Sequence, residues 1–126
     1  MKKTMLAALT IAALTSPMLG VEAAHAGNGE VRRSAACSDG SHVKLKAKPD
    51  DGRLEVEGEV DSNVNGQSWA WRLRHNGAGA GHGTRQTSGA SGSFSIHRRV
   101  GNAAGDDTLR FRATHAGEVC VISLSI

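Results

Sequence analysis

Two pairs of arginines share the same spacing along the chain. One residue separates Arg72 from Arg74, and one residue separates Arg110 from Arg112. A guanidinium group stays charged at ordinary pH and can bind a phosphate or a carboxylate through two parallel hydrogen bonds. Because alternate residues of a β-strand point to the same side, each pair would lie on one face of a strand. In the β-sandwich that we expect, the strand with Arg72 and Arg74 pairs with the strand that carries the other two arginines. The four side chains then form one surface that suits a polyanion or an acidic protein surface.

The other polar clusters lack the ligands of a metal site. The segment 61–66 imitates the start of a calcium-binding loop, but Arg72 stands where such a loop needs a bidentate Glu. The histidines do not follow the spacing of zinc ligands. His42 and His97 could meet near Glu59 on one sheet face, which is the nearest approach to a zinc site. We expect neutral surface histidines and no metal.

No group of residues indicates catalysis. Ser91 lies in a Gly-Ala-Ser-Gly segment that lacks the spacing of a nucleophile elbow. The glutamates of segment 55–59 alternate along one strand and face lysines, which keeps the carboxylates ionised rather than poised as acids. We therefore expect a protein that is not an enzyme and uses no cofactor.

Two alternatives to anion binding stay open. A carbohydrate-binding module would stack sugars on Trp69 and Trp71, but alternation with Arg72 and Arg74 places the indoles inside. An inhibitor of an extracellular enzyme would use a loop such as 78–83, whose glycines lose much conformational entropy on binding. The sequence has only 2 Trp, 2 Phe and no Tyr, which argues against a base-stacking surface.

The spacing of apolar residues predicts a fold built from β-strands. Charged residues (21%) and hydrophobic residues (39%) occur in the proportions of a globular domain. Short segments that alternate apolar and polar residues are separated by glycine-rich turns. We expect a single antiparallel β-sandwich of about seven strands, of the immunoglobulin or fibronectin type III kind, with a small closed barrel as the alternative. The expected strands are 42–48, 53–60, 67–75, 84–87, 93–99, 108–114 and 118–126.

The first two expected strands form a hairpin with a charged outer face. Pro49-Asp50-Asp51-Gly52 has the residues of a turn. If this turn places Lys48 beside Arg53, Lys46 faces Glu55 and Lys44 faces Glu57, with His42 facing Glu59. Such pairs of opposite charge mainly select the register of the hairpin.

The beginning of the sequence has the three parts of a signal peptide. Two lysines precede an apolar run from 5 to 14, and Ala24-His25-Ala26 supplies small residues for cleavage. We expect residues 1–26 to be removed, although cleavage after Ala23 also fits. No lipid-accepting Cys or membrane anchor is found, so we expect a secreted, extracellular protein that is monomeric. The expected organisation is a signal peptide over 1–26, a flexible lead-in over 27–36 and a β-sandwich domain over 37–126.

The two cysteines, Cys37 and Cys120, predict a disulfide. Outside the cell an even number of cysteines indicates bridges, and here only one pairing exists. The bridge would close most of the expected domain into one loop, which the chain-entropy model rates at roughly 4 to 5 kcal/mol. We expect this bridge to be structural.

The sequence resembles a family of small secreted actinobacterial proteins of uncharacterised function. The resemblance covers residues 37–126 and implies an exported single-domain protein, without an activity or functional residues to transfer. The segments that carry it are Lys44-Leu45-Lys46, Asp51-Gly52-Arg53, Glu59-Val60-Asp61-Ser62-Asn63, Gly66-Gln67, Trp69, Trp71-Arg72, Gly92-Ser93-Phe94 and Gly117-Glu118-Val119-Cys120.

Overall fold

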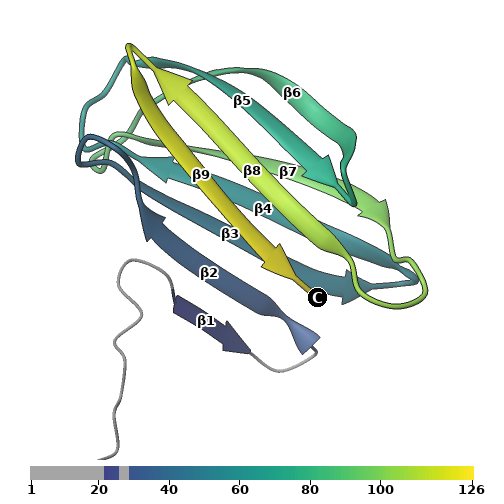
Figure 1. The fold of residues 1–126 in the computed structure, drawn as a ribbon. Coiled ribbons are helices and arrows are strands. Elements are labelled where there is room, and N and C mark those ends of the chain that lie inside the picture. The colour runs from purple at the N-terminus through teal and green to yellow at the C-terminus, as the bar shows by residue number, and fades with distance from the viewer. Residues whose placement is uncertain (1–21, 26–28) are drawn as a thin grey trace, which may run out of the picture.

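The computed structural model describes residues 22–25 and 29–126. Most of the predicted signal peptide (1–26), with the cleavage site after Ala26, lies outside the described residues. Those that are described contain strands and no α-helix, and hence no helix that could span a bilayer. The strands are β1 (Glu22–His25), β2 (Val31–Ala36), β3 (His42–Asp50), β4 (Arg53–Asp61), β5 (Ser68–His75), β6 (Ala78–Gln86), β7 (Ser93–Gly101), β8 (Thr108–His115) and β9 (Glu118–Ser125) (Figure 1).

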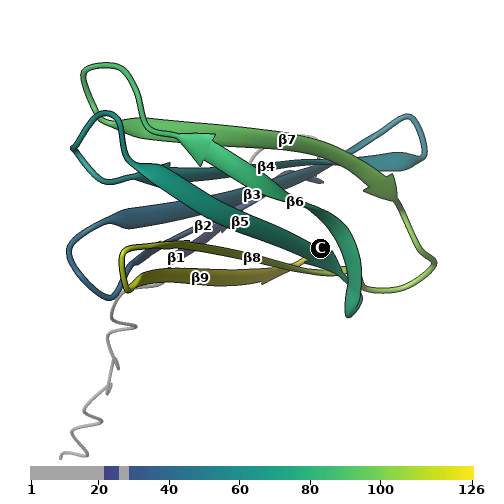
Figure 2. The ribbon, with the colours of Figure 1, turned by 90° about the horizontal axis from the view of Figure 1, so that it is seen from above.

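The strands form two sheets in which every neighbouring pair is antiparallel. One sheet has the order β1-β2-β3-β4-β7 and the other has the order β6-β5-β8-β9. Figures 1 and 2 show the two sheets packed against each other. The predicted antiparallel β-sandwich is confirmed. All seven expected strands are present as β3 to β9, and β2 and β1 extend the first sheet beyond them.

The core follows the alternation of the sequence. Trp69, Trp71 and Leu73 of β5 are buried between the sheets, while Arg72 and Arg74 are exposed. The other strands repeat this pattern, and each large apolar side chain removed from water contributes about 1.5–3 kcal/mol before the entropy of ordering is counted. The remaining fully buried large side chains include Phe111, Leu45, Leu54, Ile96, Leu109 and Leu124.

One glycine is needed to bring the sheets together. Gly58 of β4 is buried, and a Cβ atom at its position would lie 3.0 Å from three ring atoms of Phe111 on the opposite sheet. A larger residue at this position would force the ring to move. The absence of a side chain at Gly58 therefore makes the space that Phe111 fills.

The register of the first hairpin differs from the expected one by two residues. Asp50 pairs with Arg53, so the turn contains only Asp51 and Gly52, and both have positive φ angles (58° and 78°). A two-residue turn of this kind matches the twist of a hairpin, and it leaves Pro49 inside β3. The expected pairs Lys46–Glu55 and Lys44–Glu57 are therefore wrong. The observed ion pairs are Lys48–Glu55 (3.6 Å), Lys46–Glu57 (3.8 Å) and Lys44–Glu59 (3.8 Å).

The segment expected to be a flexible lead-in (27–36) is largely a strand. β2 pairs with β3 along its whole length, from Val31 opposite Ala47 to Ala36 opposite His42. The sequence of β2 lacks alternation because Arg33 occupies an inward-facing position, where its guanidinium donates to the Ser123 carbonyl (3.3 Å). Backbone hydrogen bonds to the β3 edge order this segment, together with the burial of Val31.

The glycine-rich segment 78–83, expected to be a loop, belongs to β6. This strand runs from Ala78 to Gln86 rather than over 84–87, and it has a bulge at Ala80. Cβ atoms at Gly81 and Gly83 would lie 3.1 and 3.2 Å from the Trp71 indole, so the glycines let the backbone lie against that ring. The small residues thus serve packing rather than flexibility.

The disulfide between Cys37 and Cys120 is present. It links the segment after β2 to β9, and so connects the two sheets at one side of the sandwich. Disulfides persist in oxidising compartments, which points to an environment outside the reducing cytosol.

Candidate anion-binding face

The structure brings the four predicted arginines together. β5 and β8 are the two central strands of their sheet, and in their register Arg72 lies opposite Arg112 while Arg74 lies opposite Arg110. All four side chains are exposed and together line a surface hollow of about 410 Å³. We call the surface formed by these four residues the arginine face.

The buried side chains between the arginines hold the face in place. Leu73 lies between Arg72 and Arg74 in sequence, and Phe111 lies between the other two; both are completely buried, and they are opposite each other in the register. Because β5 and β8 each have a neighbour on both sides, their backbone groups are used within the sheet. The arginine stems therefore start from rigid positions.

The outward-facing residues of β5, β6, β8 and β9, all of which the structure describes, include no carboxylate around the arginines. In the register, Ser123 is opposite Arg110, Val121 is opposite Arg112 and His82 is opposite Arg72. Apart from one valine, the remaining outward positions of the four strands are small, amide-bearing or hydroxyl-bearing residues. They are Ser68, Ala70, Gly79, Thr84, Gln86, Thr108, Thr114, Val119 and Ser125.

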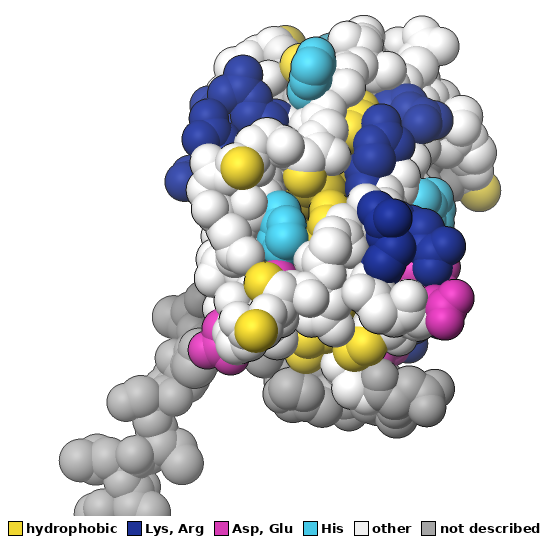
Figure 3. All heavy atoms as spheres, turned by 90° about the vertical axis from the view of Figure 1, so that its right-hand side faces the viewer, with side chains coloured by type: hydrophobic (Ala, Val, Ile, Leu, Met, Phe, Trp, Pro, Cys, Tyr) yellow, Lys and Arg dark blue, Asp and Glu magenta, His cyan; other side chains and the backbone are white. Residues whose placement is uncertain are grey.

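The arginine face makes no ion pair within residues 29–126. Like charges placed directly opposite each other across an antiparallel pair repel, so the arrangement costs stability unless an anion is bound. Figure 3, which views the molecule from the right-hand side of Figure 1, shows dark blue basic side chains over more of the surface than magenta acidic ones. The arginine face is thus an uncompensated positive surface on rigid strands.

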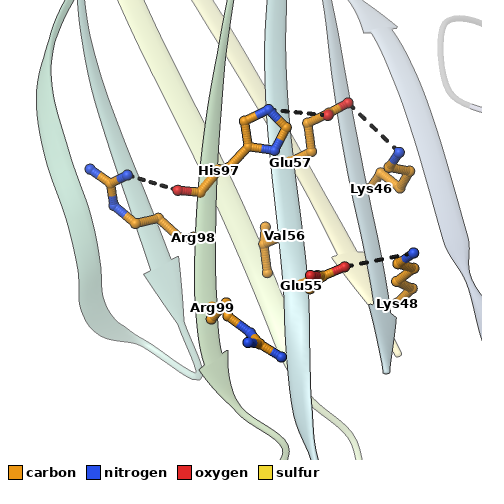
Figure 4. A pocket seen from close by; sticks show the side chains of 8 residues that line it. All are labelled: Lys46, Lys48, Glu55, Val56, Glu57, His97, Arg98 and Arg99. Carbon is orange, nitrogen blue, oxygen red and sulfur yellow. Dashed lines mark hydrogen bonds and ion pairs between the residues drawn. The ribbon is translucent and has the colours of Figure 1, made fainter. Parts of the chain in front are cut away.

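The outer face of the other sheet shows the opposite arrangement. There a hollow of about 310 Å³ is lined by residues of β3, β4 and β7, and its glutamates are paired with basic side chains (Figure 4). Glu57 is paired with both Lys46 (3.8 Å) and His97 (3.4 Å), and Glu55 is paired with Lys48 (3.6 Å). The outer faces of the two sheets therefore differ in charge balance. Among the described residues, only the β5–β8 face has no carboxylates to balance its arginines.

Both tryptophans are buried, as the alternation predicts. Trp69 is 0% exposed and Trp71 is 4% exposed. The Trp69 indole donates to the Gln67 side chain (3.2 Å), and the guanidinium of Arg98 lies 4.8 Å from the centre of the Trp71 ring, at the side of the sandwich. Neither indole offers an open surface for a sugar ring to stack on.

The structure shows where the candidate metal ligands of the sequence lie. The part of the chain that the structure describes has no group of three or more metal-ligating side chains. The calcium-like segment is a turn in which Asp61 accepts a hydrogen bond from the Asn63 backbone (3.1 Å). His42 and His97 do not meet at Glu59, because the register places His42 opposite Asp61 and His97 opposite Glu57.

A hydrogen bond between His75 and a buried carboxylate was not predicted from the sequence, which placed His75 among the surface histidines. His75 Nε2 lies 2.6 Å from the carboxylate of Asp107, which is completely buried. The hydrogen bond from His75 holds the pKa of Asp107 below its usual value, against the effect of burial, and the backbone N–H of Ala103 assists. Asp107 stands in a polar loop at the start of β8, where no periodic pattern marks it as buried.

The Asp107 cluster joins separate chain segments. Its backbone exchanges two hydrogen bonds with Ile126 (both 2.9 Å), and Thr108 and Asn76 are joined by a further pair (both 2.8 Å). In the described residues no Ser, Thr or Cys side chain is hydrogen-bonded to His75, so the pair lacks the nucleophile of a catalytic triad. Comparison with family models, curated proteins and solved structures finds no match to this chain.

Proposed function

We propose that this protein is a secreted, non-catalytic binding module whose arginine face binds an anionic partner. The observation that carries the proposal is the pairing of Arg72 with Arg112 and of Arg74 with Arg110, on central strands and without a carboxylate beside them. Guanidinium groups suit phosphates and carboxylates because each can form two parallel hydrogen bonds. The partner is a polyanion or an acidic protein surface, and the protein acts as a monomer.

Export is part of the same proposal. The disulfide between Cys37 and Cys120 fits an oxidising compartment, and residues 1–26 have the composition of a signal peptide. The resemblance to secreted actinobacterial proteins supports the same location. Cleavage after Ala26 would remove β1, whose backbone pairs with β2.

Retention on immobilised heparin and polyphosphate tests the proposal. We expect the protein to bind at low salt and to elute as the salt concentration rises, because salt screens exposed charges. The double variant Arg72→Glu/Arg110→Glu should lose retention. Its fold should survive, since each new glutamate lies opposite a remaining arginine, Arg112 or Arg74.

The double variant Arg53→Glu/Arg85→Glu is the matched control. Both of these arginines are exposed and lie outside the arginine face, and the change in net charge is the same. This control should keep its retention apart from a small shift in the eluting salt concentration. Absence of retention at low salt, or equal behaviour of the two double variants, would contradict the proposal.

A further inference from the structure

We infer that the arginine face binds a phosphodiester polymer whose phosphates are joined by three-carbon units and which carries no bases, such as poly(glycerol phosphate). This inference rests on the proposed anion-binding function and specifies its ligand. It follows from the arrangement of the four guanidinium groups, from the neighbours of the arginines and from the aromatic residues, which are all buried.

The arginines form two rows across the strands. One row is Arg72 with Arg112 and the next is Arg74 with Arg110. Within a row the Cβ atoms of an antiparallel pair are about 4.5–5.5 Å apart, so two guanidinium groups can hold one phosphate between them. Successive rows are two residues apart along each strand, which corresponds to roughly 6.6–6.8 Å.

A three-carbon phosphodiester repeat has about the length of the distance between rows. Its backbone runs P–O–C–C–C–O–P, which contains as many bonds as the path Cα–C–N–Cα–C–N–Cα between alternate residues of a strand. An extended polymer lying parallel to β5 and β8 therefore brings successive phosphates to successive rows. Each phosphate then accepts hydrogen bonds from two arginines on facing strands, Arg72 and Arg112 or Arg74 and Arg110.

The rest of the surface favours a polymer without bases. A single-stranded nucleic acid has the same spacing of phosphates, but it gains about 1–3 kcal/mol per base by stacking on aromatic side chains. Trp69, Trp71, Phe94 and Phe111 are all buried, and the sequence contains no Tyr. The outward neighbours instead include hydroxyl groups, such as that of Ser123 opposite Arg110, which suit the hydroxyls of an alditol.

An acidic peptide fits the face less well, although alternate glutamates would match the spacing. Peptides that bind sheets usually add to an exposed edge, where backbone hydrogen bonds supply affinity. Arg72 and Arg112 stand on the central strands β5 and β8, whose backbone groups are used by neighbouring strands. A peptide on this face would gain no backbone hydrogen bonds, whereas a phosphodiester polymer has none to satisfy.

The experiment measures binding of fluorescent oligomers to the purified protein by anisotropy. The oligomers have equal numbers of phosphates joined by ethane, glycerol or hexane units, and oligodeoxynucleotide and polyglutamate of equal charge complete the set. We expect the tightest binding for glycerol, with dissociation constants about tenfold higher for the hexane-linked oligomer, a difference of about 1.4 kcal/mol. The oligodeoxynucleotide and polyglutamate should also bind more weakly than the glycerol oligomer.

Two double variants test the row geometry. Arg72→Gln/Arg112→Gln removes one row and with it one phosphate contact, so the slope of log affinity against log salt should fall by about 0.7. Arg72→Gln/Arg74→Gln leaves one arginine in each row, so affinity should fall while the slope changes less. Arg53→Gln/Arg85→Gln is the control with the same loss of charge outside the face.

The outcomes separate this inference from the proposed function. Equal binding of all linker lengths, equal slopes for the two double variants, or tighter binding of the oligodeoxynucleotide or polyglutamate would overturn the phosphodiester geometry and leave anion binding intact. Failure to bind any of these anions, together with no retention on heparin, would remove both.

Discussion

Arg72 and Arg112 lie directly opposite each other on the two central strands of a sheet, and among residues 29–126 no carboxylate is paired with either. The same molecule places Lys44 opposite Glu59 on its other sheet, at 3.8 Å. Opposed charges of like sign destabilise an antiparallel pair, and charges of opposite sign stabilise it. The arginine pair is therefore a local cost to stability, which an anion would offset.

The substitution Arg72→Glu should increase stability while it reduces anion binding. The new carboxylate faces Arg112 and replaces repulsion by attraction, which contributes about 0.2–1 kcal/mol. For a domain of this size the melting temperature should rise by up to about 4–8 °C. Urea or thermal unfolding measures the effect. A loss of more than about 1 kcal/mol would mean that Arg72 supports the fold and not a ligand.

A charge exchange tests the register of the first hairpin. Lys44→Glu places a carboxylate opposite Glu59 and should cost about 0.2–1 kcal/mol. Adding Glu59→Lys should restore most of the loss, whereas adding Glu57→Lys should restore less. A double-mutant cycle on urea unfolding measures the two coupling energies. A larger coupling between positions 44 and 57 would instead support the register that the turn sequence suggests.

Acid should weaken the fold through Asp107. Its pKa in the folded protein is lowered from the usual 3.8 because the carboxylate accepts a hydrogen bond from His75. A carboxyl group whose pKa is lower in the folded than in the unfolded state binds fewer protons when folded. Its stabilisation is complete above the unfolded pKa and is lost as pH falls through the folded pKa. The wild-type protein should therefore lose stability below about pH 4 in part through this residue.

The variant Asp107→Asn isolates this contribution. It keeps the size of the side chain but removes the charge that pairs with His75, and should cost about 1–3 kcal/mol near neutral pH. The difference from wild type should shrink in acid, because there the wild-type carboxyl group is also uncharged. Urea unfolding at several pH values measures both effects, and a constant difference across the acid range would contradict the assignment.

Gly58→Ala should destabilise the core, whereas Gly79→Ala should not. The added methyl at Gly58 would lie 3.0 Å from the Phe111 ring, and overpacking of this kind costs about 1–3 kcal/mol. At Gly79 a methyl would meet nothing within 4 Å. Combining Gly58→Ala with Phe111→Leu should reduce the cost of the glycine substitution, since the smaller side chain relieves the contact. Equal stability of the two alanine variants would show that Phe111 can move freely.

Alternation alone predicts which side chains are inside. Trp69, Trp71 and Leu73 are buried and Arg72 and Arg74 are exposed because side chains of a strand alternate between its faces, wherever that strand lies in the sheet. The cysteine pair was likewise predictable, since only one pairing exists. Alternation also allowed the seven segments to be assigned as strands. The exception is the start of β6, where Ala78 and the glycines that follow hide the pattern.

Alternation did not predict which residues lie opposite each other on neighbouring strands. The register of β3 and β4 depends on the positive φ angles of Asp51 and Gly52, which shift each lysine by two residues relative to the expected glutamate. β2 has no alternation to detect, and its order comes from backbone hydrogen bonds to β3. Asp107 looks like an ordinary loop residue, and only the folded chain buries it against His75.

Strand periodicity and the two cysteines predict a β-sandwich with a disulfide and an outward position for each arginine, because the period of a strand is a local property. The pairing of β5 with β8 was expected from the predicted fold, but the register that places Arg72 opposite Arg112 is seen only in the folded chain. Strand pairing joins residues that are far apart in the chain. The register of the pair is selected by the packing of Leu73 against Phe111 together with the turns between strands. The charge of the surface was thus encoded locally, and its geometry was set by long-range packing.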